Sequence, residues 1–393
     1  MSRFDFHRAR RDTRACNELL HFNNAGASLM PAPVSDSLRA YLREEELGGG
    51  YETAEAQAGA LANFYTASAK LLNCREAEIG FIENATRAWD MVFYAFEFAP
   101  GDRILTTTSE YGSNVIAYLQ QAERYGAEVV FIPDDAQGQI DIKALEAAID
   151  ERTKLISISH IPTGGGLVNP AAEVGRIARS ANVPYLLDAC QSVGQLPLDV
   201  EQLGCTMLTG TGRKYLRGPR GAGLLYVRED WIVRLQPPLL DQHAAELTSA
   251  NSYKVRGDAK RFENWEQPFA GKAALAVAID YALSWGLDSI WERVQTLAAT
   301  LRSQLAALDG VTVVDQGETQ CGIVTFTVDA KSADDIKASL QVRRINVSVC
   351  SGSGNLVSYD RRGLIETVRA SVHYFNTEDE IERFIEVLAS IIE

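Results

Sequence analysis

The feature that most constrains the fold is an alternation of short apolar runs with amphipathic stretches, from about residue 50 to residue 230. The apolar runs are Arg103–Thr106, Glu128–Ile132, Leu155–Ser159, Tyr185–Leu187 and Leu224–Val227. The amphipathic stretches between them include Asn114–Tyr125, Ile142–Ile149 and Ala171–Ser180. Short strands that are apolar throughout and alternate with helices are typical of a mostly parallel sheet covered on both faces. The pattern therefore predicts an α/β fold.

The last hundred residues show a different pattern. A long helix is expected around Ser289–Leu308, strands at Val311–Val314, Ile323–Val328, Val347–Val349 and Val368–Tyr374, and helices near Ala333–Gln341 and Glu378–Ile392. This arrangement predicts a smaller α+β layer. Because 393 residues are too many for one compact core, we expect a large α/β domain over residues 21–285. A small α+β domain should cover residues 286–393, and the N-terminal segment 1–20 should pack with it.

Composition excludes several classes of protein. A net charge of −14 argues against a general basic face for nucleic acid. There is no apolar run of membrane-spanning length, and the charged N-terminus lacks the apolar core of a signal peptide. The six cysteines form no CxxC pair, which favours reduced thiols in the cytoplasm. With five histidines and no HExxH motif, we expect no metal site.

Polar residues follow three of the predicted strands. They are His160–Gly166 after the first, Asp188–Gln191 after the second and Thr209–Lys214 after the third. Ligands in open α/β sheets bind beyond the carboxyl ends of the strands. These three segments are therefore the best candidates for a binding site.

Asp188 and Lys214 together point to one chemistry. A carboxylate at the end of a buried strand needs a cationic or donor partner, and Lys214 lies in a turn followed by Gly218, Gly221 and Gly223. If each residue is considered without the other, Asp188 is expected to cap the next helix and Lys214 to be a solvated loop residue. Pyridoxal phosphate needs both, a lysine for its Schiff base and an acid for its pyridine nitrogen. The glycine pattern matches no nucleotide-binding loop, because GxxxxGK[ST] is absent and no GxGxxG opens a helix after a strand.

With these residues the chain resembles the class V aminotransferase family. That family is part of the fold-type I group of pyridoxal phosphate enzymes, with cysteine desulfurases, selenocysteine lyases and isopenicillin N epimerase-like proteins. The resemblance runs from HFNNAG near the start, through LLDACQSVGQLPLDV and TGTGRKYLRGPRGAGLLYV, to VRAS and FNT near the end. It implies a sheet of the seven-stranded type, pyridoxal 5′-phosphate as cofactor, a small amino-acid substrate and a homodimer with residues of both subunits near each site.

The resemblance also implies a role for each matching residue. Lys214 would form the internal aldimine and move protons at Cα, and Asp188 would hold the pyridine nitrogen. Gln191 would contact the phenolic oxygen or the substrate. Tyr111, where the family often has histidine, would stack on the ring. Tyr111 could instead be plain core.

Further positions match the cofactor phosphate site and the substrate site of the family. Ala85 and Thr86 would cup the phosphate at a helix start, and Thr211 and Arg213 would complete that site. Thr163 matches a position that contacts the phenolic oxygen. The residues expected at the substrate are Arg369, which would bind the α-carboxylate, Asn24 and Trp265. The alternatives are a helix cap for Thr86, a surface ion pair for Arg369 and rim packing for Trp265.

Two segments depart from the cysteine desulfurase pattern. Cys350 falls about two residues before the position of the persulfide-forming cysteine, which is occupied by Gly352 or Ser353. A free cysteine at a strand end is more often a small buried hydrophobe than a nucleophile. Trp265 and Glu266 stand where desulfurases usually have a Gly-Thr pair, and they are closer to the epimerase-like and sulfoxide-lyase-like branch. In a dimer of the family type, these two would line the neighbour's pocket.

The expected function is therefore β-elimination from a sulfur-containing amino acid, a carbon–sulfur lyase reaction. Class V aminotransferase and amino-acid epimerase activity are the alternatives, and a persulfide-forming desulfurase is the less favoured one. A third hypothesis is a binding protein without catalytic activity. The presence of both Asp188 and Lys214 argues against it. Substrate selectivity should lie in the loops Leu239–Tyr253 and Cys350–Arg362, whose course the sequence does not predict.

Overall fold

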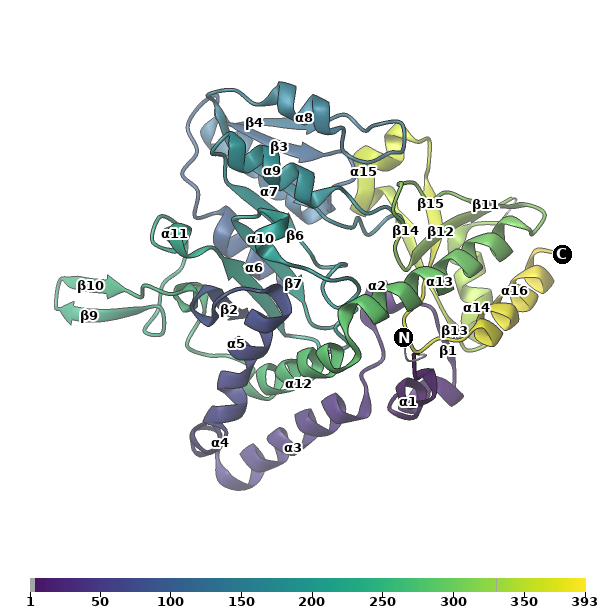
Figure 1. Ribbon diagram of the computed structural model, residues 1–393, viewed down its shortest axis with the longest axis horizontal. Helices are drawn as coiled ribbons and strands as arrows, with labels where there is room; N and C mark the ends of the chain where they lie inside the picture. Colours follow the sequence, from purple (N-terminus) through teal and green to yellow (C-terminus); the bar gives the residue numbers. More distant parts are fainter. Residues whose placement is uncertain (1–3, 330) are drawn as a thin grey trace.

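The computed structural model describes residues 4–329 and 331–393, so the first three residues of the expected N-terminal segment lie outside the described residues. Figure 1 shows a large sheet with helices on both sides and a second, smaller sheet beside it near the C-terminus. The α/β class predicted from the alternating pattern is confirmed.

The large sheet has seven strands in the order β2-β8-β7-β6-β5-β3-β4. Their bounds are β2 (Ile79–Ile82), β3 (Arg103–Thr107), β4 (Glu128–Ile132), β5 (Thr153–Ser159), β6 (Tyr185–Asp188), β7 (Met207–Thr211) and β8 (Gly223–Val227). The five strands from β7 to β4 run parallel to one another, while β8 is antiparallel to β7 and to β2. The expected mostly parallel, seven-stranded sheet is thus present.

Alternate residues of the strands pack into two different cores. On β6, Tyr185 and Leu187 join the core formed with α5 (Ala58–Leu72), α9 (Ala171–Ser180) and α12 (Phe269–Trp285). Leu186 points the other way, into a core shared with α6 (Ala85–Phe93) and α7 (Gly112–Tyr125). Successive side chains of a strand face opposite sides of the sheet. Strands covered by helices on both faces are therefore mostly apolar on both faces, as β6 and β8 are.

The smaller sheet is antiparallel, with the strand order β11-β12-β15-β14. Its strands are β11 (Val311–Val313), β12 (Ile323–Val328), β14 (Ser348–Ser351) and β15 (Glu366–Ser371), and its helices are α13 (Leu287–Ala306), α14 (Ala333–Val342) and α16 (Glu378–Ile392). The last strand begins and ends earlier than expected, at Glu366 and Ser371 rather than Val368 and Tyr374. Helix α13 meets α12 at 79°, at Gly286, whose positive φ of 80° suits glycine.

The N-terminal segment contacts both parts of the chain. Phe4 stacks on Trp285 at 5.0 Å between ring centroids, and Arg10 pairs with Glu380 of α16 at 2.6 Å. Strand β1 (Leu20–His21) pairs in parallel with β13 (Ile345–Asn346). The proposed division of the chain near residue 285 stays a prediction. None of the described helices alone is long and apolar enough to span a membrane, and α12 with α13 passes only as a bent pair.

Several elements were not expected from the sequence. They are the helices α1 (Phe6–Arg11), α2 (Asn24–Ala27), α3 (Ala32–Gly48), α4 (Gly50–Ala56), α10 (Val200–Leu203), α11 (Glu229–Ile232) and α15 (Gly352–Arg361), and the strands β9 (Ala245–Ser249) and β10 (Ser252–Val255). Helix α8 (Ile142–Ala148) was expected and ends one residue before its predicted end. Strands β9 and β10 form a hairpin that projects from the body of the molecule (Figure 1). Helix α15 occupies most of the loop expected at Cys350–Arg362.

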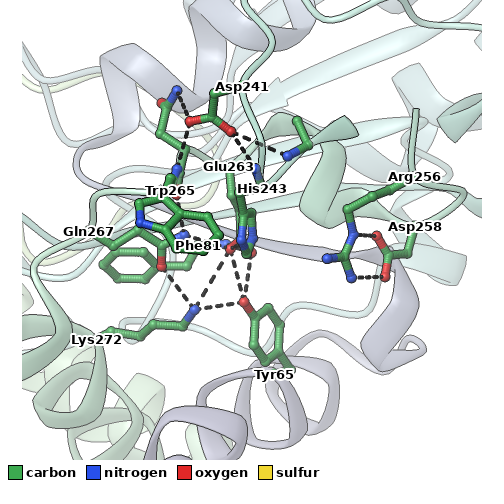
Figure 2. A network of polar contacts seen from close by, with 12 residues as sticks. Tyr65, Phe81, Asp241, His243, Arg256, Asp258, Glu263, Trp265, Gln267 and Lys272 are labelled. Atoms are coloured by element: carbon green, nitrogen blue, oxygen red, sulfur yellow. Dashed lines mark hydrogen bonds and ion pairs between the residues drawn. The ribbon is translucent and has the colours of Figure 1, made fainter. Parts of the chain in front are cut away.

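A buried polar network anchors the base of this hairpin (Figure 2). The Glu263 side chain is fully buried and accepts hydrogen bonds from the Tyr65 hydroxyl at 2.8 Å, the Phe81 amide at 2.9 Å and His243 at 3.0 Å. Lys272 lies 3.7 Å from the same carboxylate. The network therefore joins the chain just before β9 to helices α5 and α12 and to strand β2.

Candidate active site

The carboxyl ends of neighbouring strands bring the three predicted segments together. In the register of the sheet Ser159 of β5 is opposite Asp188 of β6, and Asp188 is opposite Thr209 of β7. A cavity with about 610 Å³ of empty space, part of it open to solvent, lies at this edge. Its lining residues are Asn84, Ala85, Thr86, Trp89, Tyr111, Asn114, Ser159, Ile161, Thr163, Asp188, Cys190, Gln191, Thr211, Arg213 and Lys214.

Asp188 ends strand β6 and is only 8% exposed. One of its carboxylate oxygens accepts the amide of Cys190 at 2.9 Å, and the other accepts the side-chain amide of Asn114 at 3.2 Å. Two neutral donors do not neutralise a carboxylate. A cationic group in the cavity would complete its pairing.

Lys214 lies in a tight turn after β7. The amide of Gly218 bonds to the carbonyl of Gly212 at 2.8 Å, and the amide of Arg217 bonds to the carbonyl of Lys214 at 2.9 Å. A Cβ added at Gly212 or Gly218 would lie 2.8 or 2.9 Å from Leu275 of α12, so close packing requires glycine there. These bonds and contacts hold the turn at the edge of the sheet, where Lys214 lines the cavity.

The electrostatic surroundings of Lys214 favour a neutral amine. Burial lowers the pKa of its side chain to about 8, and the neighbouring Arg213 lowers it further, while Cys190 and Asp188 act in the opposite direction. Within the described part of the chain, the amine makes no hydrogen bond and no ion pair. A neutral amine is the form that attacks an aldehyde.

The start of helix α6 lines the cavity opposite the lysine turn. Asn84 caps the helix by accepting the amide of Arg87 at 2.9 Å. The amides of Ala85 and Thr86 in the first turn keep no partner among the described residues. Free amides at a helix N-terminus bind anions, and Arg213 in the same cavity adds positive charge.

Thr163 connects two of the other predicted residues. Its hydroxyl accepts Arg369 Nη1 at 2.5 Å and Gln191 Nε2 at 3.2 Å. The Gln191 Oε1 and Arg369 Nε atoms are buried without a hydrogen-bond partner in the described ranges. Arg369 is thus adjacent to the cavity, with a donor available for a ligand.

Tyr111 lines the cavity and is 39% exposed, so it is not a core residue. It stands at the N-cap of α7, and its amide donates to Glu110 at 2.8 Å. Tyr111 shares the cavity with Asp188 and Asn114, so its partly exposed ring offers a face on which a flat ligand could stack.

Two residues predicted at the substrate do not line the cavity. Asn24 is completely buried, and its amide donates to the carbonyl of Ser371 at 2.7 Å while its oxygen accepts Ser28 at 2.7 Å. Trp265 is 54% exposed, near the base of the hairpin, and its amide donates to Asp241 (Figure 2). In this chain Asn24 holds the N-terminal segment against the small sheet.

Sequence reasoning missed several residues of the site. They are Asn84, Trp89, Asn114, Ser159, Ile161 and Cys190. Cys190 and Ile161 belong to two of the polar segments predicted at the strand ends, so their positions in those segments were a usable signal. Asn114 opens a predicted helix and carries no motif, and only the packing of α7 against β6 brings it to Asp188.

The cysteines near the site are poorly placed as nucleophiles. Cys350 is 6% exposed in strand β14, and its thiol lies 3.4 Å from the carbonyl of Thr163. Burial raises the pKa of Cys190 well above its ordinary value, and the Asp188 carboxylate acts in the same direction. Gly352 begins helix α15, and the side chain of Ser353 lies outside the described part of the structure.

Taken together, these residues fit pyridoxal phosphate. The orphaned amides at α6 and Arg213 suit a phosphate, Asp188 suits a protonated pyridine nitrogen, and Lys214 suits an aldehyde. The partly exposed ring of Tyr111 suits the flat ring of the cofactor.

Comparisons with known proteins agree with this fit. The model of the family "Aminotransferase class-V" matches residues 20–384. A probable cysteine desulfurase of Methanothermobacter thermautotrophicus is 28% identical over 391 residues, covering 97% of each chain. The apo structure of a cysteine desulfurase from Thermococcus onnurineus is 27% identical, with a TM-score of 0.92 over 100% of this chain and 99% of that one. The cystine C–S lyase C-DES, 24% identical with a TM-score of 0.86, shares the fold over 96% of this chain and 99% of its own.

Proposed function

The chain belongs to the class V aminotransferase family of pyridoxal phosphate enzymes, and from this premise we propose that it eliminates a sulfur group from Cβ of an amino acid. The cofactor is pyridoxal 5′-phosphate, and the substrate is an amino acid. Two of the proteins named above are called a probable cysteine desulfurase and a cysteine desulfurase, which favours sulfur at Cβ. The products would be a thiol, pyruvate and ammonia.

The residues would divide the work as follows. Arg369, whose Nε has no partner among the described residues, would bind the substrate α-carboxylate. When bound, pyridoxal phosphate takes up the negative charge that develops at Cα. The Lys214 amine removes the Cα proton and transfers a proton to the departing sulfur. The Cα–H and Cβ–S bonds break, a Cα–Cβ double bond forms, and the released enamine takes up water to give pyruvate and ammonium.

The observation that carries the choice of elimination is the position of Cys350. A desulfurase needs a thiol that can reach the substrate sulfur and carry it away as a persulfide. Cys350 is buried in β14 with its thiol near the Thr163 carbonyl, and it is followed by helix α15 rather than a long loop. Moving this thiol to the substrate would require disrupting the strand. The sulfur would therefore leave as a small molecule.

The test is a product analysis with cysteine, cystine and cysteine S-conjugates. Elimination predicts pyruvate and ammonia in equal amounts, with no alanine. Variants Cys350→Ser and Cys190→Ser should keep turnover within about threefold, since neither thiol accepts sulfur. Alanine with a protein-bound persulfide, lost in Cys350→Ser, would instead establish a desulfurase. Keto acid formed only with an amino acceptor would establish a transaminase, and D-amino acid an epimerase.

We also propose that the chain acts as a homodimer in the cytoplasm. The hairpin β9–β10 projects into solvent and carries the exposed apolar side chains Leu247 (73% exposed) and Tyr253 (61%), with Trp265 near its base. Apolar side chains on a projecting hairpin suit burial against another subunit. Light scattering should give a mass near twice 43.1 kDa, and Leu247→Asp with Tyr253→Asp should shift it toward the monomer. A monomeric wild-type protein would refute this proposal.

A further inference from the structure

A second carboxylate, that of Glu110, lies close to Asp188. The proposed reaction gives it no role. Glu110 follows strand β3 and is 2% exposed. It accepts five hydrogen bonds, from the amides of Ser159 and Tyr111 at 2.8 Å, the side-chain amide of Asn114 at 3.0 Å, the Thr106 hydroxyl at 3.2 Å and the Ser159 hydroxyl. The lining of the cavity does not include it. Glu110 is therefore a fully occupied acceptor one layer below the site.

Asn114 bridges the two carboxylates. Its side-chain nitrogen donates one hydrogen to Glu110 at 3.0 Å and the other to Asp188 at 3.2 Å. An amide nitrogen has two hydrogens, so both are used. The opposite orientation would set the amide oxygen against two carboxylates. Glu110 thereby determines the orientation of the amide that reaches Asp188.

We propose that Glu110 is a positioning residue for the cofactor, acting through Asn114 on Asp188. It holds the Asn114 amide so that Asp188 keeps one fixed orientation and presents its carboxylate to the pyridine nitrogen. Through the Tyr111 amide the same carboxylate fixes the start of α7, next to the tyrosine that lines the cavity. The inference rests on the proposed function, because the group that Asp188 meets is the pyridine nitrogen.

Electrostatics supports this arrangement. Burial raises the pKa of Glu110 to about 7, and the nearby Asp188 raises it further, while the hydrogen bonds from Ser159, Tyr111 and Asn114 oppose the rise. All five contacts are made to Glu110 as an acceptor, which suits the ionised form. Two carboxylates bridged by one neutral amide favour a positive charge beside them. A protonated pyridine nitrogen supplies that charge.

The test measures the affinity of the apoprotein for pyridoxal phosphate by quenching of tryptophan fluorescence, which needs no turnover. Glu110→Gln and Asn114→Leu should each weaken binding about tenfold, the size of one hydrogen bond to a charged group. If Glu110 acts through Asn114, the double variant should bind within about twofold of Asn114→Leu alone. Thr106→Val is the matched control, because it removes a donor to Glu110 on the side away from Asn114. It should change binding less than twofold.

A structural role would lower the thermal midpoint of the apoprotein in Glu110→Gln and in Thr106→Val alike, without a selective loss of cofactor affinity. The inference would be overturned if the losses of cofactor affinity in the two single variants multiply in the double variant. It would also be overturned if Glu110→Gln binds the cofactor as tightly as the wild type. If Glu110→Gln does not fold, the single and double variants are compared with Glu110→Asp instead. Aspartate keeps the negative charge, but its shorter side chain places the carboxylate farther from Asn114. A wild-type protein that takes up no pyridoxal phosphate overturns the proposed function itself.

Discussion

Arg369 is joined to Thr163 by two hydrogen bonds from the same nitrogen, Nη1 to the hydroxyl oxygen at 2.5 Å and to the carbonyl oxygen at 3.1 Å. The Thr163 hydroxyl also accepts Gln191. One edge of the guanidinium is thereby fixed beside the cavity. Its Nε is buried and has no partner among the residues described, which leaves it available for a carboxylate.

Replacing Arg369 with lysine should mainly weaken substrate binding. A lysine cannot bond to Thr163 and to a carboxylate with the same planar fork. We expect kcat/KM to fall about 100-fold, from the loss of roughly 3 kcal/mol of charged hydrogen bonding, with most of the change in KM. Steady-state kinetics with the best substrate of the panel measures it. Thr163→Val should show a smaller rise in KM and Thr163→Ser almost none, and equal effects of these two variants would contradict the role given to the hydroxyl.

Lys214 should carry the cofactor covalently. Borohydride treatment of the holoprotein should attach the cofactor to Lys214, and peptide mass spectrometry identifies the position. Lys214→Ala should lose the visible absorbance of the lysine-bound cofactor and reduce turnover by a factor of at least about 1,000, since it removes the nucleophile and the base. Lys260→Ala is a suitable control because this lysine stacks over Tyr65, away from the cavity. Cofactor found on another lysine would contradict the assignment.

The rate at which the apoprotein takes up pyridoxal phosphate should depend on pH. Only the neutral amine attacks the aldehyde, and the pKa of Lys214 is lowered to about 8. The rate should therefore rise between pH 7 and pH 9 and level off above. Stopped-flow absorbance measures this profile. A rate that keeps rising to pH 10.5 would show that the amine has the proton affinity of a solvated lysine.

The same shift has a consequence for the stability of the apoprotein. Because the folded pKa of Lys214 is below the unfolded one, its contribution to stability is present above pH 10.5 and is lost as the pH falls through about 8. The free energy of unfolding of Lys214→Met relative to wild type should change over this window. Urea melts of both apoproteins between pH 7.5 and pH 10.5 test the sign. A pH-independent difference would contradict it.

The Tyr111 ring should matter more than its hydroxyl. An aromatic contact contributes about 0.5–1.5 kcal/mol, so Tyr111→Ala should weaken cofactor binding about two- to tenfold. Tyr111→Phe should stay within about twofold of wild type, because the ring is retained. Fluorescence titration of the apoproteins measures both. If Tyr111→Phe binds as weakly as Tyr111→Ala, the hydroxyl rather than the ring makes the contact.

Glu263→Gln should destabilise the fold strongly. The change leaves the Lys272 ammonium buried without its carboxylate, 3.7 Å away in the native structure, and breaking such a pair costs about 3–5 kcal/mol. Urea unfolding of the apoprotein measures the loss. The double variant with Lys272→Met should recover part of it, because the uncompensated charge is gone. A double variant as unstable as the sum of the two single ones would show that the pair is not coupled.

Much of the fold was predictable because the pattern of apolar residues along the sequence matches the burial of the strands and helices in the large sheet. Strands such as Glu128–Ile132 and the helix Ala171–Ser180 have the predicted bounds, since apolar runs and 3.6-residue periods report directly on which faces are covered. The hairpin at Ala245–Val255 was missed because its strands are polar and exposed, so no burial pattern marks them. Helix α15 was missed for a related reason, since Gly352 and Gly354 disfavour a helix and its position depends on contacts with α7.

The sequence by itself determined the family and the cofactor, because Asp188 and Lys214 stand at strand ends in motifs that match the class V aminotransferase family. Through the same resemblance it predicted phosphate donors at Ala85 and Thr86, which the structure places at the start of helix α6. Only the tertiary structure decided which other residues meet them. Asn114 reaches Asp188, Glu110 lies beneath both, and Thr163 links Arg369 to Gln191, while Asn24 is turned away into the core. These relationships join residues far apart in the chain, and packing between layers sets them, which no local pattern encodes.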